Sequence, residues 1–118
     1  MLKLYDCKTA PSPRRARMFL AEKGIEWETI EVDLRTGAQM SQEFLAINPR
    51  ATVPALVTQD GDVIGENIGI AAYVEALHPS PPLLGTTALE KARVLEWDFR
   101  ITMEGLSAIA EVLRNSSP

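Results

Sequence analysis

The stretch NPRATVPAL, Asn48 to Leu56, joins a loop, a proline and the start of an apolar strand. Pro54 directly precedes a mainly apolar strand predicted at residues 55–58, and a proline has no N–H to donate to a central ladder. It therefore marks an edge, a strand start or a special turn. Asp60-Gly61 is a typical hairpin turn, so residues 63 and 64 are expected to form a second strand beside the first.

Periodicity and capping residues predict the elements around this hairpin. They comprise strands at residues 2–6 and 27–33 and helices at 13–23, 41–47 and 66–77. Ser12 is a good N-cap for the first of these helices, Pro13 suits its first position, and Ser41 is expected to cap the second. The order is β-α-β-α-β-β-α, in which two strands joined through a helix imply a right-handed parallel crossover. We therefore predict an α/β fold with a mixed four-stranded sheet and helices on its faces.

A change in composition after residue 78 predicts a domain boundary. HPSPPLLG, residues 78–85, is rich in proline and is typical of an interdomain linker. Residues 88–114 contain no proline and are predicted to form one long helix with two apolar stripes. A helix that is apolar on so wide a face belongs inside a bundle, so we expect its packing partner in a longer protein or in another chain. The predicted domains are 1–78, a linker at 79–86, and the truncated start of a second domain at 87–118.

The composition is that of an ordinary globular protein and narrows the classes of partner. Of the 118 residues, 46% are hydrophobic and 24% are charged, and the formal net charge is -4. No basic run exceeds Arg14-Arg15-Ala16-Arg17, which argues against nucleic acid as a partner. The single cysteine, Cys7, excludes an internal disulfide and a zinc cage, and no metal site is expected. Because neither a signal-peptide core nor an apolar run of about 18 residues occurs, we expect a cytoplasmic protein without a membrane contact.

The stretch TAPSPRRARMF, Thr9 to Phe19, places basic residues at the mouth of the first predicted helix. Helix starts prefer negative side chains because their free N–H groups carry partial positive charge. Arg14, Arg15 and Arg17 break this preference. They form either a solvated basic face or an electropositive mouth for an anionic ligand, to which Arg50 would add.

Together these motifs resemble the N-terminal domain of the glutathione transferase family. The resemblance rests on the order of the elements, on Ser12-Pro13 after the first strand, on VPAL at Val53 to Leu56 and on Glu66-Asn67. It covers about residues 1–78 and implies a thioredoxin-like fold. The long helix then resembles the first helix of the family's all-helical second domain. The family is typically homodimeric, so the resemblance implies a homodimer. It also implies a cytoplasmic protein with a role in detoxification.

The resemblance also implies an enzyme that binds glutathione as a co-substrate, stabilises its thiolate and conjugates it to a small electrophile. Ser12 stands where several transferase classes carry their catalytic serine or cysteine. A hydroxyl at a helix N-terminus is able to donate to a bound thiolate, and the helix dipole adds stabilisation, so the thiol pKa falls. Without this role, Ser12 would be only an N-cap. Cys7 and Thr9 in the same loop are alternative catalytic residues.

The same resemblance assigns the remaining site residues to the binding of glutathione. Val53-Pro54 resembles the family's cis-proline, which would turn the Val53 backbone N–H and C=O towards the cysteinyl unit like a sheet ladder. The Thr52 side chain would help to orient the peptide. Glu66 and Asn67 would hold the γ-glutamyl end, and Asn67 stands where the family usually has serine. Asn67 is also expected to cap the helix at 66–77, and without the ligand role it would be only a cap.

Two other functions stay open at this point. A transferase-like domain also fits a non-enzymatic interaction or regulatory module. Two departures from the family's pattern favour this alternative, namely Asn67 in place of serine and Arg14 in place of an aromatic or small residue. Glutathione-dependent redox chemistry is the third alternative, although it would favour a cysteine where the sequence has Ser12. Titration with glutathione separates the enzyme from the interaction module, because the enzyme must bind glutathione and the module need not.

Overall fold

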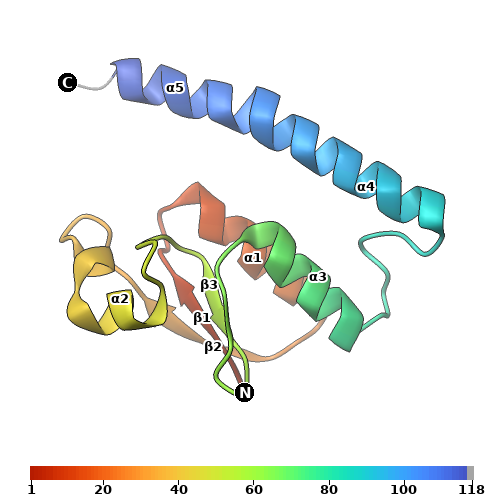
Figure 1. Cartoon of the computed structure of the whole chain (residues 1–118), viewed down its shortest axis with the longest axis horizontal. Helices are drawn as coiled ribbons and strands as arrows, with labels where there is room; N and C mark the ends of the chain where they lie inside the picture. The colour runs from red at the N-terminus through yellow and green to blue at the C-terminus, as the bar shows by residue number, and fades with distance from the viewer. Residues whose placement is uncertain (117–118) are drawn as a thin grey trace. The chain divides into compact units, whose positions relative to one another are not determined.

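The computed structural model describes residues 1–116, and the chain divides into two units, Met1–Pro81 and Pro82–Pro118 (Figure 1). The strands of the first unit are β1 (Leu2–Asp6), β2 (Trp27–Glu31), β3 (Ala55–Val57) and β4 (Val63–Ile64). Its helices are α1 (Pro11–Glu22), the 3-10 turn η1 (Ala38–Met40), α2 (Gln42–Ile47) and α3 (Asn67–Leu77). The second unit contains α4 (Ala88–Arg100), the π-helical segment η2 (Ile101–Leu106) and α5 (Ser107–Ser116). The last two residues of the predicted 87–118 segment lie outside the described residues.

The four strands form one mixed sheet in the order β2-β1-β3-β4, which confirms the predicted fold. β1 runs parallel to β2, and β3 runs antiparallel to both β1 and β4. The strand predicted at 27–33 is too long, because β1 ends at Asp6, opposite Glu31. One further backbone bond, from the Val32 N–H to the Asp6 carbonyl at 2.7 Å, closes this pairing. The strand predicted at 55–58 likewise stops one residue early, at Val57.

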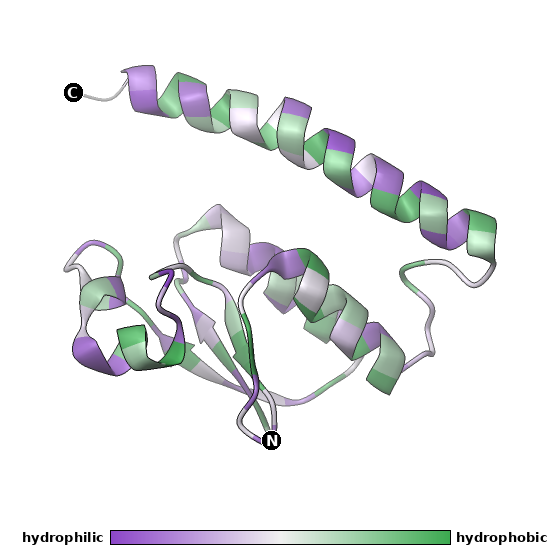
Figure 2. Ribbon diagram, viewed as in Figure 1, coloured by the Kyte–Doolittle hydropathy of each residue, from purple (hydrophilic) through white to green (hydrophobic). Residues whose placement is uncertain are grey.

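Alternation along β1 sends Leu2 and Leu4 to one face of the sheet, where α1 and α3 pack side by side. Figure 2 colours much of α3 as hydrophobic, as a core-packing helix requires. The buried cluster on this face consists of Leu2, Leu4, Ala16, Leu20, Leu56, Ile70 and Val74. Each fully buried leucine or isoleucine gains about 1.5–3 kcal/mol from its removal from water. This core therefore fixes α1 and α3 relative to each other.

α2 covers the opposite face of the sheet near the end of β1. Tyr5, which alternation places on that face, packs against Phe44 of α2 with ring centroids 5.6 Å apart. A second buried cluster gathers Cys7, Val32, Phe44 and Val53. It joins the loop after β1 to the loop before β3, since these strands are antiparallel neighbours. Both loops carry predicted site residues.

The start of α1 differs from the prediction. The helix begins at Pro11, so Ala10 is the N-cap and Ser12 lies inside the first turn without a capping hydrogen bond. The prediction of Ser12 as the N-cap is therefore wrong. Its physical cause is that Pro11 and Pro13 both suit the first turn of a helix, so the local sequence permits a start at either one.

The starts of α2 and α3 form a contrasting pair. Ser41 caps α2 as predicted, since its hydroxyl accepts a hydrogen bond from the Phe44 N–H at 3.2 Å. α3 begins at Asn67, with Glu66 as its N-cap, and no side chain caps it. The expectation that Asn67 caps this helix is wrong, because Asn67 is already the first helical residue and its side chain turns its amide nitrogen to Ser12.

Lys23 anchors the segment that follows α3. Its side chain is fully buried, its ammonium pairs with Glu75, and it donates to the carbonyls of His78 and Pro81 at 2.6 and 2.5 Å. A buried ammonium needs such acceptors because its desolvation is costly. The exit from the first unit is thereby tied to the end of α1.

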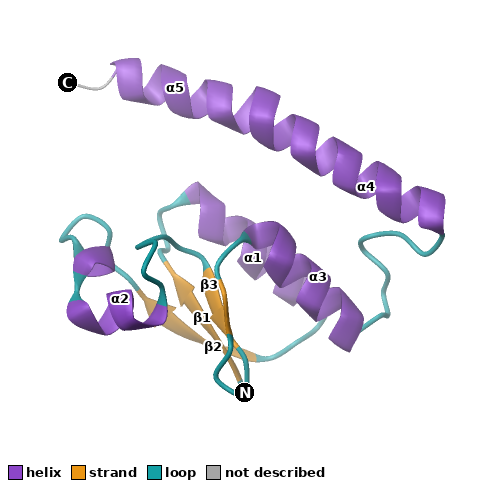
Figure 3. Ribbon diagram, viewed as in Figure 1, coloured by secondary structure: helices purple, strands orange, loops and turns teal. Residues whose placement is uncertain are grey.

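The second unit contains the predicted long helix, with one departure from it. The helix runs without interruption from Ala88 to Ser116 (Figure 3). Its middle part, Ile101–Leu106, is π-helical. Most of its large apolar side chains are exposed, with Trp97 at 56% and Phe99 at 66%. Within residues 1–116, no helix is both long and apolar enough to cross a membrane.

Candidate functional site

Ser12 and Asn67 meet at the point where α1 and α3 begin. Ser12 is the second residue of α1, and Asn67 is the first residue of α3, 55 positions further along the chain. The Asn67 Nδ2 donates to the Ser12 Oγ and to the Ser12 carbonyl oxygen, both at 3.1 Å. The structure thus brings two predicted site residues into direct contact, one from each helix start.

Neither helix start at this point is closed by its own side chains. α1 and α3 both lack a side-chain capping bond, and neither carries an acidic residue in its first turn. The first N–H groups of a helix have no intrahelical partner, and the helix dipole places partial positive charge there. Two such ends side by side create a local preference for an anion.

A short loop before β3 carries Thr52, Val53 and Pro54. The Val53–Pro54 peptide bond is cis, and both side chains are buried. Within residues 1–116, no backbone hydrogen bond forms from the Val53 N–H or to the Val53 carbonyl. Val53 shares a buried cluster with Cys7, so this loop lies against the loop that leads from β1 to Ser12.

Asn48 shapes that loop and was not predicted as a site residue. It is buried, and its Nδ2 donates to the Thr52 carbonyl at 2.8 Å and to the Thr52 hydroxyl at 3.2 Å. Its Oδ1 accepts from the Arg50 N–H at 3.1 Å, and Ala51 adopts a left-handed backbone with φ of 57°. An asparagine whose side chain bonds to the backbone two residues on is a common turn former, so Asn48-Pro49 was the available signal.

Cys7 and Thr9, the alternative catalytic residues, interact with each other. The Cys7 Sγ lies 3.6 Å from the Thr9 Oγ1. This hydrogen bond lowers the pKa of the Cys7 thiol, burial opposes the effect, and backbone groups of Leu34, Thr9 and Ala10 add to the lowering. Cys7 is only 5% exposed and packs in the core, whereas Ser12 and Thr9 are exposed. The hydroxyls are therefore more accessible to a ligand than the thiol.

The arginines after Ser12 do not act as one group. Arg17 binds the buried carboxylate of Asp6 through its Nη1, at 2.7 Å to Oδ1 and 2.9 Å to Oδ2. A buried carboxylate requires such a partner, so Arg17 is structural. Arg14 is exposed. The expectation of an electropositive mouth built from all three arginines thus fails at Arg17.

Glu66 and Asn67 differ in exposure and in bonding. Glu66 is exposed and precedes α3, where its carbonyl accepts from the Ile70 N–H at 2.9 Å. The Asn67 Oδ1 is buried, and no hydrogen-bond donor reaches it from the part of the chain that the structure describes. The polar end of Asn67 is thus satisfied on its nitrogen side alone.

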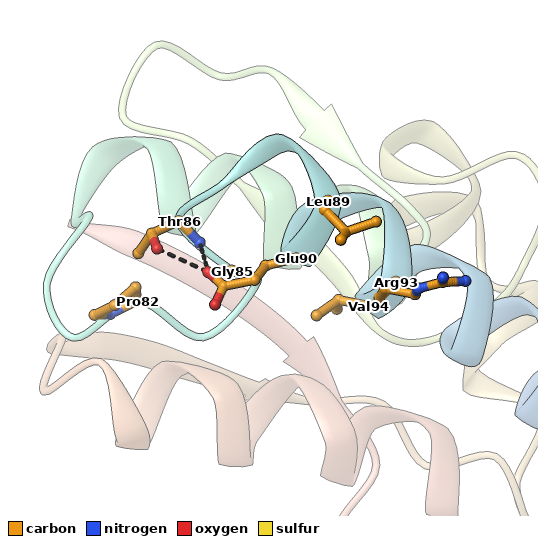
Figure 4. A pocket seen from close by; sticks show the side chains of 7 residues that line it. All are labelled: Pro82, Gly85, Thr86, Leu89, Glu90, Arg93 and Val94. Atoms are coloured by element: carbon orange, nitrogen blue, oxygen red, sulfur yellow. Dashed lines mark hydrogen bonds between the residues drawn. The ribbon is translucent and has the colours of Figure 1, made fainter.

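A separate hollow of about 580 Å³ lies in the second unit (Figure 4). It is lined by Pro82, Gly85, Thr86, Leu89, Glu90, Arg93 and Val94. The Glu90 carboxylate accepts from the Thr86 N–H at 2.9 Å and from its hydroxyl at 2.8 Å. These bonds lower the pKa of Glu90. The hollow contains none of the predicted site residues, and its acidic group is occupied by the start of α4.

Comparison with known proteins identifies the family. The family model "Glutathione S-transferase, N-terminal domain" matches residues 9–77. Glutathione S-transferase 2 of Saccharomyces cerevisiae is 34% identical over 117 residues, which make up 98% of this chain and 50% of that protein. Glutathione S-transferase Z1 of Arabidopsis thaliana is 45% identical over 84 residues, 70% of this chain and 37% of that protein.

Solved structures agree with this result. A glutathione S-transferase domain-containing protein from Marinobacter aquaeolei VT8 superposes with a TM-score of 0.86 at 33% identity, over 92% of this chain and 54% of its own. A glutathione transferase homologue from Sulfitobacter, solved with bound glutathione, gives 0.85 at 26% identity, over 98% of this chain and 55% of its own. The chain spans about half the length of these proteins. It belongs to the glutathione S-transferase family.

Proposed function

We propose that the first unit binds glutathione, that Ser12 stabilises the thiolate, and that the thiolate is conjugated to a small electrophile. The observation that carries the proposal is the contact of Ser12 with Asn67 between two helix starts without side-chain caps. Free backbone N–H groups and helix dipoles at such a point favour negative charge. Glutathione supplies two carboxylates and, when ionised, a thiolate.

In the proposed reaction, the Ser12 hydroxyl donates a hydrogen bond to the sulfur of glutathione. The bond favours the charged form, so the thiol pKa falls and the thiol proton passes to solvent. A sulfur lone pair then forms a bond to the electrophilic carbon. In a substitution the leaving group departs with its bonding electrons, and in an addition the displaced pair stays on the acceptor. Ser12 keeps its own proton throughout.

The backbone of Val53 is assigned to the cysteinyl unit of glutathione. Its N–H and C=O have no backbone partner within residues 1–116, and an extended peptide pairs with such groups as an added strand does. Pro54 follows Val53 and begins the approach to β3. Asn48 supports this binding edge indirectly, because it holds the carbonyl and hydroxyl of Thr52. The Thr52 hydroxyl accepts from Asn48, so its own proton is available for a hydrogen bond to glutathione.

The γ-glutamyl end is assigned to the start of α3. The exposed Glu66 carboxylate would accept from the ammonium of that unit. Because Asn67 uses its amide nitrogen on Ser12, we assign the γ-glutamyl carboxylate to the free backbone N–H groups of α3. Asn67 is thus expected to contact Ser12 and not the γ-glutamyl carboxylate.

The proposal extends to the organisation of the whole protein. Residues 1–78 form the glutathione-binding domain, 79–86 the linker and 87–118 the start of a helical domain. The exposed apolar residues of the second unit, such as Trp97 and Phe99, suit packing in a longer or homodimeric protein. We propose a cytoplasmic detoxification enzyme that takes a small electrophile and needs no metal, nucleic acid or membrane.

Calorimetric titration tests the binding. Glutathione and S-methylglutathione, which lacks the ionisable thiol, are titrated into the unsubstituted chain and into Ser12→Ala. Both ligands should bind the unsubstituted chain, and Ser12→Ala should weaken glutathione alone. Absence of binding at millimolar glutathione would contradict the proposal and favour an interaction module. Loss of glutathione affinity in Cys7→Ala, with Ser12→Ala unaffected, would transfer the chemical role to Cys7.

A further inference from the structure

We infer that Asn67 is a positioning residue that holds the Ser12 hydroxyl as a hydrogen-bond donor towards the bound thiolate. The inference rests on the proposed function and adds a residue to its chemistry. Its basis is a pair of bonds from one amide nitrogen to both oxygen atoms of Ser12, each 3.1 Å long. Asn67 thereby acts through Ser12 and needs no contact with glutathione.

The Ser12 carbonyl fixes which end of the amide faces Ser12. A carbonyl oxygen only accepts, so the group opposite it must be the amide nitrogen and not the amide oxygen. One amide hydrogen goes to that carbonyl and the other goes to the Ser12 Oγ. A lone pair of the hydroxyl is then occupied, and its own proton points away from Asn67. This is the state in which Ser12 is able to donate to a thiolate.

A common core supports the two helix starts that carry this pair. Ser12 and Asn67 sit in the first turns of two helices that pack on one core. The Asn67 Oδ1 is buried, and within the described residues it receives no hydrogen bond. A buried acceptor without a donor is unfavourable, so the two bonds from Nδ2 to Ser12 are what favour this orientation of the amide. The same two bonds orient Ser12.

Reversing the direction of one hydrogen bond tests the inference. Asn67→Asp is nearly isosteric but offers only acceptors, so the Ser12 hydroxyl would donate to the new carboxylate and turn from the sulfur. An acidic residue is favourable at a helix start, so the fold should persist. Asn67→Ser removes the amide donor without adding charge. Gln59→Glu adds the same charge at the exposed hairpin and is the matched control.

The measured quantity is the pKa of the thiol of bound glutathione, followed by the ultraviolet absorbance of the thiolate as pH is varied. Asn67→Asp should raise this pKa by about one unit, which corresponds to one hydrogen bond to a charged group. Asn67→Ser should raise it by less, and Gln59→Glu should leave it unchanged. In a Ser12→Ala background, the effect of Asn67→Asp should shrink to that of the added charge.

Three results would overturn the inference. An equal rise in the presence and absence of the Ser12 hydroxyl would show that only charge acts. An unchanged pKa in Asn67→Asp and Asn67→Ser would show that Ser12 needs no positioning. If the unsubstituted chain binds no glutathione, the proposed function itself fails, and that result is visible before any variant is made. Thermal melts report whether the variants are folded. If Asn67→Asp does not fold, the thiol pKa in Asn67→Ser tests the inference instead.

Discussion

The helix starts at the candidate site and the start of α4 are built in opposite ways. At α4, the Thr87 hydroxyl accepts from the Glu90 N–H at 3.1 Å, and the Glu90 carboxylate accepts from the Thr87 N–H at 3.2 Å. At α1 and α3 no side chain caps the helix, and Ser12 and Asn67 bond to each other instead. The first arrangement closes a helix end, whereas the second leaves two ends open.

The difference shows that residue type does not decide what a polar residue at a helix start does. Serine, threonine and asparagine are all strong capping residues. Thr87 finds its partner three residues away, while the partner of Ser12 is 55 residues away on another helix. A closed end contributes stability, and an open end keeps its N–H groups for a ligand.

The largest effect is expected for Ser12→Ala. The rate of conjugation of glutathione to an aryl halide should fall about a hundredfold, as for the loss of one preorganised donor to a developing or stabilised anion. The thermal midpoint should change little, because Ser12 makes no capping bond and the hydrogen bond that its hydroxyl accepts from Asn67 is exposed. A lower midpoint with an unchanged rate would mean that Ser12 is a cap after all, and the contrast with Thr87 would disappear.

Arg17→Ala should mainly affect stability. It leaves the Asp6 carboxylate, 2% exposed, without its partner, and we expect a loss of about 2 kcal/mol because Arg17 itself is partly exposed. Urea unfolding measures this loss. Arg14→Ala, at an exposed position of the same helix, serves as the control and should stay within about 0.5 kcal/mol. Weaker glutathione binding in Arg17→Ala without a loss of stability would return Arg17 to the site.

Thr87→Ala should give the reverse of the Ser12 result. It removes one bond of the capping box and should destabilise the start of α4 by about 1 kcal/mol. Circular dichroism follows the helical signal during unfolding. The affinity of the first unit for glutathione should not change. A change in affinity with an intact helix would show that this cap also serves the ligand.

The smallest effect is a pH dependence at Glu90. Hydrogen bonds from the Thr86 N–H and hydroxyl, and from the Thr87 N–H, hold the pKa of Glu90 below its ordinary value. The folded form therefore binds this proton less readily than the unfolded form, so the stabilisation is present above the ordinary glutamate pKa of about 4.3. It is lost as pH falls through the lower, folded pKa. Glu90→Gln should remove this acid-dependent loss of helicity, and equal acid profiles for both proteins would contradict the assignment.

The fold followed from the sequence because its signals are local. The alternation in Leu2 to Asp6, the Asp60-Gly61 turn and the cap at Ser41 each depend on neighbours within a few residues. The same holds for the long helix after residue 87. The π-helical segment Ile101–Leu106 was not predicted, since nothing in its local pattern sets it apart from α-helix.

The site was predictable only in its residue types. Ser12 and Asn67 were both named, but each was expected to cap its own helix, and their contact depends on the packing of α1 against α3. The pairing of Arg17 with Asp6 likewise joins a helix to a strand. Asn48 was missed because its hydrogen bonds lie within a loop that periodicity does not describe.

We propose that the open helix starts bind glutathione and that Ser12 stabilises its thiolate. The most direct measurement is the thiol pKa of bound glutathione in the unsubstituted chain, in Ser12→Ala and in Thr87→Ala. We expect a pKa below that of free glutathione in the unsubstituted chain and in Thr87→Ala, and a return towards the free value in Ser12→Ala. A pKa that equals the free value in the unsubstituted chain, or that Ser12→Ala leaves unchanged, would contradict the proposal.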